Sequence, residues 1–228
     1  MSKSMRNDVR TLAYVLRRTN YGEADRILNL ITPEGKFSVI AKGVRKEKSK
    51  LAGGVEMFSL IDANIHLGKG ELGIITSAKM LKYYSAILKD FSKMEFAALV
   101  LKKINIAAEN SDTNELFKII DEVFAALDRN ENILVIQAWF WFNLSKALGN
   151  QINLYRDVLG EKLVENLRYS WDGAEEALRA REGGEIDADS IKIMRLMVAT
   201  DLSVVLRVRG IEKKISPILR IAEANAKN

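Results

Sequence analysis

The residues from Lys42 to Lys50 form the densest cluster of cations in the chain. Five of the nine carry positive charge and one, Glu47, carries negative charge. Because like charges this close together repel one another, such a segment is favourable chiefly where phosphates or solvent surround it. The chemistry it indicates is the binding of a polyanion, and a solvated connecting loop is the alternative.

The excess of cations is confined to the N-terminal part of the chain. Residues 1–89 carry 16 Lys and Arg against 8 Asp and Glu, a net charge of +8, whereas the remainder carries 19 against 22, a net charge of −3. This division suggests a polyanion-binding module joined to a nearly neutral one, although a basic surface can also serve solubility alone. The predicted phosphate contacts are Arg17, Arg18, Lys36, Lys42, Arg45, Lys46, Lys48 and Lys50.

Aromatic side chains in the same part of the chain could stack on nucleic-acid bases. Small five-stranded barrels bind single strands by pairing a basic groove with such stacking platforms. Of the four candidates, Tyr14 and Phe58 fit better in a barrel core. Tyr21 and Phe37 flank turns and both roles stay open for them, and Phe37 joins the predicted DNA-binding residues.

No pattern in the sequence predicts catalysis or a bound cofactor. The chain has no cysteine and a single histidine, His66, which excludes thiol nucleophiles, disulfides and cysteine- or histidine-rich metal sites. His66 is better explained as a structural or surface residue. The carboxylate pairs Glu23/Asp25 and Glu175/Glu176 are better explained as turn, cap or solvent-facing residues. We therefore predict no catalytic residue, no metal, no cofactor and no enzyme activity.

Short apolar runs separated by turn residues predict five strands before residue 80. Pro33-Glu34-Gly35 predicts the turn between the second and third strands, and Gly68-Lys69-Gly70 a hairpin turn between the last two. Five strands in about 70 residues suggest a small barrel. The predicted strands are Thr11–Arg17, Arg26–Ile31, Phe37–Ala41, Val55–Leu67 and Leu72–Ala78.

From about Tyr83 onward the apolar residues recur with a helical period. Ile133–Leu148 is apolar nearly all round, as expected of a central bundle helix, but it is too short and too often interrupted by polar residues to span a bilayer. The other predicted helices run from about 94 to 108, from 112 to 127, from Ser190 to Arg209 and onward from Ser216-Pro217. The predicted fold class is α+β, all-β then all-α, with a barrel domain over 1–81 and a helical-bundle domain over 82–228.

Several N-terminal motifs, in their order and spacing, resemble the RecO family of recombination mediators. The resemblance covers about residues 9–80 and implies an OB-fold barrel followed by a helical domain. The motifs are Tyr14-Val15-Leu16-Arg17-Arg18, Tyr21-Gly22-Glu23-Ala24-Asp25-Arg26-Ile27, Thr32-Pro33-Glu34-Gly35, Ala41-Lys42-Gly43-Val44-Arg45 and Lys48-Ser49.

The resemblance also implies a function. Members of this family are DNA-repair proteins, not enzymes, that bind single- and double-stranded DNA and anneal complementary strands. They engage the tail of the single-strand-binding protein and work with RecR to load the RecA recombinase. On this basis we expect a cytoplasmic, nucleoid-associated protein, and the polar segment Met1–Arg10 predicts no export signal. An OB-fold RNA-binding protein and a protein adaptor that binds no DNA are the alternatives.

The helical half matches the family only in outline. Many members hold zinc with four cysteines in the region that corresponds to residues 150–190, and this chain has none. The resemblance therefore implies that other packing replaces the contribution of the metal to folding. For the tail of the single-strand-binding protein we expect contacts from cations near a helix end, where a solvated terminus is the alternative. These cations are Arg207, Arg209, Lys213 and Lys214.

Overall fold

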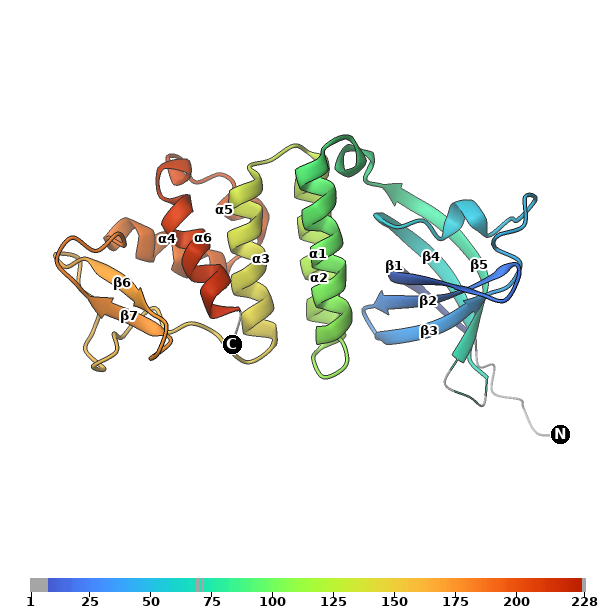
Figure 1. Cartoon of the computed structure of the whole chain (residues 1–228), viewed down its shortest axis with the longest axis horizontal. Coiled ribbons are helices and arrows are strands. Elements are labelled where there is room, and N and C mark those ends of the chain that lie inside the picture. Colours follow the sequence, from blue (N-terminus) through green and yellow to red (C-terminus); the bar gives the residue numbers. More distant parts are fainter. Residues whose placement is uncertain (1–7, 69, 71, 227–228) are drawn as a thin grey trace. The chain divides into compact units, whose positions relative to one another are not determined.

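The computed structural model describes residues 8–68, 70 and 72–226 of the chain, which Figure 1 shows as a ribbon. Two compact units can be distinguished, residues 1–120 and residues 121–228. The helix α2 (Thr113–Asp128) contains the point of division. The domain boundary at 81/82, where the strand pattern ends, stays a prediction. Residues 1–7 of the N-terminal segment, for which no export signal is expected, lie outside the described residues.

The first unit begins with a closed five-stranded barrel, as the sequence predicts. Its strand order is β1-β2-β3-β5-β4, in which β3 and β5 run parallel and the other neighbours antiparallel. This is an OB-like barrel. Lys69, in the predicted turn before β5, is not among the described residues. The strands are β1 (Asp8–Tyr21), β2 (Asp25–Thr32), β3 (Gly35–Ala41), β4 (Ser59–His66) and β5 (Leu72–Tyr83).

Alternating side chains of β1 explain how the barrel is filled and covered. Ala13 and Val15 point into the barrel core, which is made of small and branched apolar residues from all five strands. Tyr14 lies between them in sequence and therefore faces outward. It is fully buried there, with its hydroxyl 2.8 Å from that of Tyr84 and its ring 5.1 Å from that of Phe117. The helices that follow the barrel, η2 (Ser85–Lys89) and α1 (Phe91–Ala107), pack in this first unit, with α1 against β1.

The second unit is largely helical, as predicted. Its central helix α3 (Ile133–Ala147) is buried along most of its length and packs against α4 (Ala188–Ala199), α5 (Leu202–Val205) and α6 (Ile215–Asn225). The Asn132 side chain caps its start, and Gly149 follows its end with a φ of 85°. Within the described part of the chain, no helix is long and apolar enough to cross a membrane.

The single helix predicted over Ser190–Arg209 is wrong, because the chain forms α4, a break and then α5. Thr200 has an extended backbone at the break. The indole of Trp139 in α3 donates to the Thr200 carbonyl at 3.0 Å, so this carbonyl does not need a helical partner. Apolar periodicity continues through both pieces, and it could not reveal a break made by a residue 61 positions away.

Residues 150–190 contain five buried apolar side chains and a two-stranded sheet which the sequence did not predict. The sheet pairs β6 (Tyr169–Asp172) with β7 (Ala177–Ala180), and Tyr169 also exchanges backbone hydrogen bonds with Ile186 at 2.8 and 3.0 Å. Gly184 is required here, since a Cβ atom would lie 2.6 Å from the Tyr169 carbonyl oxygen. The buried side chains are Ile152, Leu154, Tyr169, Leu178 and Ile186.

This segment does not fit the zinc that many relatives are expected to hold. It offers no cysteine, and the described residues contain no group of three or more His, Cys, Asp or Glu placed to ligate a metal. Backbone pairing and buried apolar side chains are the contacts that the structure shows in this segment.

We predict that removing metal leaves the stability of the protein unchanged. Because the fold of residues 150–190 depends on packing and backbone pairing, a millimolar chelator should shift the thermal midpoint by less than about 1 °C, whereas structural zinc contributes folding free energy directly. Differential scanning fluorimetry with and without the chelator checks this. A drop of several degrees would contradict a metal-independent second unit.

Candidate nucleic-acid interface

The turn between β1 and β2 holds the start of the basic loop, which we define as residues 42–50. The Gly43 N–H donates to the Asp25 side chain at 2.7 Å, and the Arg45 N–H donates to the Ala24 carbonyl at 2.9 Å. Gly43 has a φ of 63°, a conformation that suits glycine. In Figure 1 both segments lie at the same end of the barrel.

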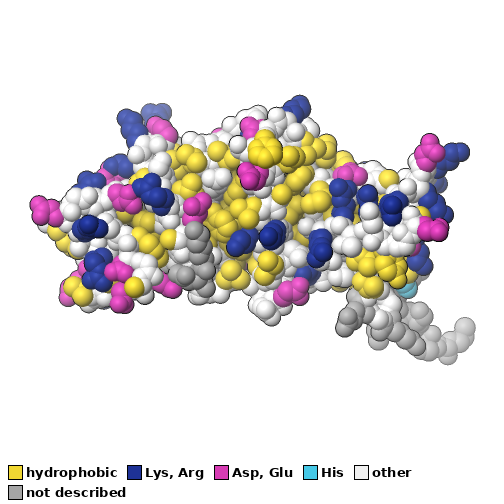
Figure 2. All heavy atoms as spheres, in the orientation of Figure 1, with side chains coloured by type: hydrophobic (Ala, Val, Ile, Leu, Met, Phe, Trp, Pro, Cys, Tyr) yellow, Lys and Arg dark blue, Asp and Glu magenta, His cyan; other side chains and the backbone are white. Residues whose placement is uncertain are grey.

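All five cations of the basic loop are exposed to solvent. Among the described residues, none of them forms an ion pair with an acid. The one cation with a further contact is Arg45, whose guanidinium lies 3.4 Å from the Gly22 carbonyl oxygen. Figure 2 shows Lys and Arg side chains projecting at this end of the barrel. The charge of the loop is therefore available to an external anion.

Three further arginines lie on the strands that lead to this end of the barrel. Arg17 is exposed, while Arg18 forms an ion pair with Glu56 at 2.8 Å. Arg26 lies opposite Ala41, the residue before Lys42, and its half-buried side chain donates to Asn20 Oδ1 at 3.2 Å. The sequence analysis did not include Arg26 among the cations of this end of the barrel. Pairing the second and third strands outward from the turn that follows Thr32 predicts that Arg26 lies opposite Ala41.

Lys36 and Phe37 lie at the other end of β3 from the basic loop. Lys36 donates to the Asn105 carbonyl at 2.8 Å and forms an ion pair with Glu109, and its side chain is only 12% exposed. Phe37 packs, partly buried, against the barrel core. The structure does not bring these two residues together with the loop, and their contact with DNA stays a prediction.

Of the other aromatic candidates, Tyr14 and Phe58 are buried and Tyr21 is exposed. Tyr21 is the last residue of β1 and immediately precedes Gly22, at the end of the barrel that carries the basic loop. It is therefore the one of the four that reaches solvent beside the cations.

Acidic side chains elsewhere on the barrel have partners of their own. A hydrogen bond from the Arg10 guanidinium lowers the pKa of Asp62, and the Thr11 hydroxyl lowers the pKa of Glu34. His66 is exposed, with Nδ1 2.7 Å from Asp8 Oδ1, as expected of a surface histidine.

The four cations proposed to meet a protein partner differ in their surroundings. Arg207, Arg209 and Lys213 are exposed. Lys214 instead forms an ion pair with Asp187, the residue that caps α4. Burial alone would raise the pKa of Asp187, but hydrogen bonds from Lys214 Nζ and from the N–H and hydroxyl of Ser190 outweigh it, so this pKa lies well below its ordinary value.

Because folding lowers the pKa of Asp187, its ionised carboxylate stabilises the fold at pH values above the ordinary carboxyl pKa of about 4. This stabilisation is lost as the pH falls through the folded-state pKa. We predict that Asp187→Asn, which keeps a capping side chain but removes the charge, costs about 1–2 kcal/mol at pH 7. The cost should shrink steadily below about pH 4. Thermal melts of both proteins from pH 7 to 2 test this, and a constant difference at all pH values would contradict it.

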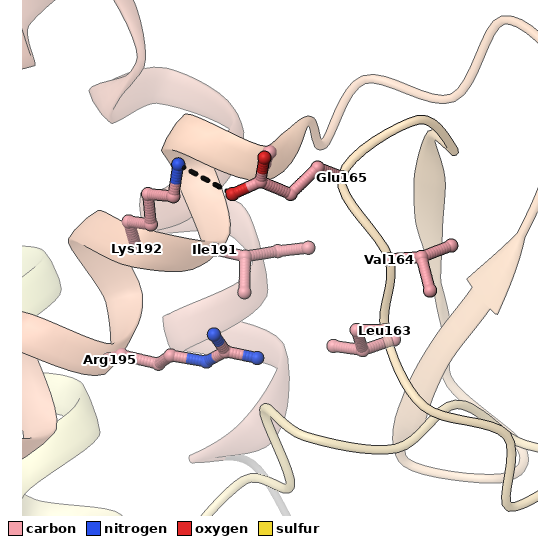
Figure 3. Close-up of a pocket in the computed structure, with 7 residues that line it drawn as sticks. Leu163, Val164, Glu165, Ile191, Lys192 and Arg195 are labelled. Atoms are coloured by element: carbon pink, nitrogen blue, oxygen red, sulfur yellow. Dashed lines mark ion pairs between the residues drawn. The ribbon is translucent and has the colours of Figure 1, made fainter.

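Apolar side chains and two cations line a pocket in the second unit, which Figure 3 shows. Arg195 points across it toward Leu163, and Lys192 forms an ion pair with Glu165 at 2.9 Å on one side. Arg195 is held by the Leu154 carbonyl at 2.8 and 3.0 Å. Sequence reasoning placed a cation-rimmed apolar pocket elsewhere, because these residues come from segments more than 20 positions apart.

Comparison with known proteins finds relatives that are similar along most of the chain. Residues 5–84 match the family model described as Recombination protein O N terminal. DNA repair protein RecO of Roseiflexus sp. (strain RS-1) is 28% identical over 220 residues, which cover 94% of this chain and 75% of the relative. The protein of the same name from Dehalococcoides mccartyi (strain ATCC BAA-2266 / KCTC 15142 / 195) is 25% identical over 95% of this chain and 88% of the relative. That from Alkaliphilus metalliredigens (strain QYMF) is 29% identical over 83% of this chain and 78% of the relative. An OB-like barrel, a largely helical second unit and similarity along most of its length together show that the chain belongs to the RecO family of DNA repair proteins.

Proposed function

We propose that the chain binds single- and double-stranded DNA through the basic loop and anneals complementary strands. RecO-family proteins are recombination mediators and not enzymes, so the function sought is one of binding. The observation that carries the proposal is that all five cations of the loop are exposed and make no ion pair within the described residues. The exposed Arg17 lies on β1, one of the strands that lead to this surface.

Annealing follows from charge neutralisation without a covalent step. Two complementary strands repel each other through their phosphates, and a protein that binds phosphates releases the counterions and lowers this repulsion. Phosphate contacts carry no sequence information, so the same surface can hold strands of any sequence and also a duplex.

The partners proposed for the chain are a RecR-type mediator and the tail of a single-strand-binding protein. The tail is acidic with an apolar end, so its site must combine cations with an apolar surface. Two places in the second unit offer cations: the exposed Arg207, Arg209 and Lys213, and the pocket lined by Ile191 and Arg195. Titrating a tail peptide against Arg207→Ala/Arg209→Ala/Lys213→Ala and against Arg195→Ala separates the two. Undiminished affinity in both variants would exclude both places.

The experiment that tests the proposed function measures annealing of two complementary labelled strands without nucleotide cofactor. The wild-type chain should accelerate annealing, and Lys46→Gln/Lys48→Gln/Lys50→Gln should remove most of the acceleration while the melting temperature stays unchanged. Equal acceleration by the folded variant would exclude the basic loop. An RNA strand of the same sequence that competes better than DNA would favour an RNA-binding barrel instead.

A further inference from the structure

Tyr21 is an exposed aromatic side chain that has no structural task in the barrel. It is 53% exposed, and it makes no side-chain hydrogen bond or ring contact with the described residues. Exposed Tyr155 in the second unit differs, because the Arg195 guanidinium covers its ring at 4.7 Å. Exposure alone is common for single side chains, so the position of the Tyr21 ring beside exposed cations is what indicates a role.

The surroundings of Tyr21 are those of a phosphate-binding surface. Its neighbour Gly22 offers the carbonyl that the Arg45 guanidinium approaches at 3.4 Å. The hydrogen bond from the Arg45 N–H to Ala24 holds the basic loop against the turn that follows Tyr21. Glu23 is the acid nearest in sequence and is exposed, while the Asp25 carboxylate accepts from Gly43.

We propose that Tyr21 and Arg45 form a subsite for one unpaired nucleotide, in which the tyrosine ring stacks on the base and the guanidinium binds its phosphate. A base–aromatic stack tolerates every base, because each base has a π face, and it requires that the base be unstacked from its neighbours. The inference rests on the proposed DNA binding and goes beyond it, since it assigns to Tyr21 a preference for single strands over duplex.

The test compares affinities for a single strand and for a duplex of the same length by fluorescence anisotropy. Tyr21→Ala should weaken single-strand binding by about 5- to 150-fold, the range found for loss of one stacked base, and change duplex binding by less than about 2-fold. Tyr21→Trp should restore single-strand binding, and its additional tryptophan emission should be quenched by poly(dT). Tyr155→Ala removes an exposed tyrosine of the second unit, away from the basic loop in the chain, and should change neither affinity.

Two outcomes would overturn the subsite without touching the proposed function. If Tyr21→Ala weakens single-strand and duplex binding equally, the residue supports the turn and not a base. If it changes neither while substitution of the loop lysines still weakens binding, the ring has no contact with DNA. Failure of the loop substitutions themselves would instead reject the proposed interface.

Discussion

Reversing Lys46, Lys48 and Lys50 to glutamate should weaken binding of single-stranded DNA by about 100-fold or more at about 0.1 M salt. Each phosphate that a cation neutralises on a single strand contributes a slope of about −0.7 to the dependence of log affinity on log salt, so three contacts account for about two decades at this concentration. Repulsion between the new carboxylates and the phosphates adds to the loss. All three side chains are exposed, so the fold should not change.

The control for this prediction is a second charge reversal elsewhere in the chain. Arg207→Glu/Arg209→Glu/Lys213→Glu changes the net charge by the same amount, and these side chains are exposed as well. If position matters and not total charge, this variant should bind single-stranded DNA within about 2-fold of the wild type. Equal losses in the two variants would show that net charge alone attracts the DNA.

Replacing Tyr169 by alanine should lower the stability of the second unit by about 3–5 kcal/mol, as for other buried aromatic residues replaced by alanine. The side chain is 1% exposed, and its hydroxyl accepts a hydrogen bond from the Val164 N–H at 2.9 Å. Its loss opens a cavity at a fully buried position in residues 150–190.

Tyr169→Phe is the matched variant, since it removes only the hydroxyl and should cost about 1 kcal/mol. Urea unfolding followed by circular dichroism gives both values. If Tyr169→Ala lowers the free energy of unfolding no more than Tyr169→Phe does, packing of the Tyr169 ring does not hold residues 150–190 together. Another feature must then explain their fold.

Local patterns predicted the barrel well because its strands are bounded by turn residues and filled by alternating apolar side chains. The central helix Ile133–Leu148 was also predicted nearly to the residue, since it is apolar nearly all round and Gly149 follows its end. The β6–β7 sheet and the break at Thr200 were missed. Both depend on contacts between distant residues, such as Trp139 with the Thr200 carbonyl, which no local period encodes.

Charge density predicted which loop stays exposed, but it could not predict which cations find partners within the chain. Lys36 and Arg18 resemble the loop lysines in sequence, yet Glu109 and Glu56 pair with them in the structure. Glu109 lies 73 positions from Lys36, so only the folded chain reveals the pair. Arg26 also has a partner within the barrel, because strand pairing brings it to Asn20, to which its side chain donates.

The salt dependence of single-strand affinity tests the central claim most directly. With four to six phosphates neutralised, a plot of log affinity against log salt concentration should have a slope of about −3 to −4 for the wild type. For the Lys46, Lys48 and Lys50 reversal it should fall to about −1 to −2, because three contacts are lost. A wild-type slope near zero, or the same slope in both proteins, would contradict binding of DNA by the basic loop.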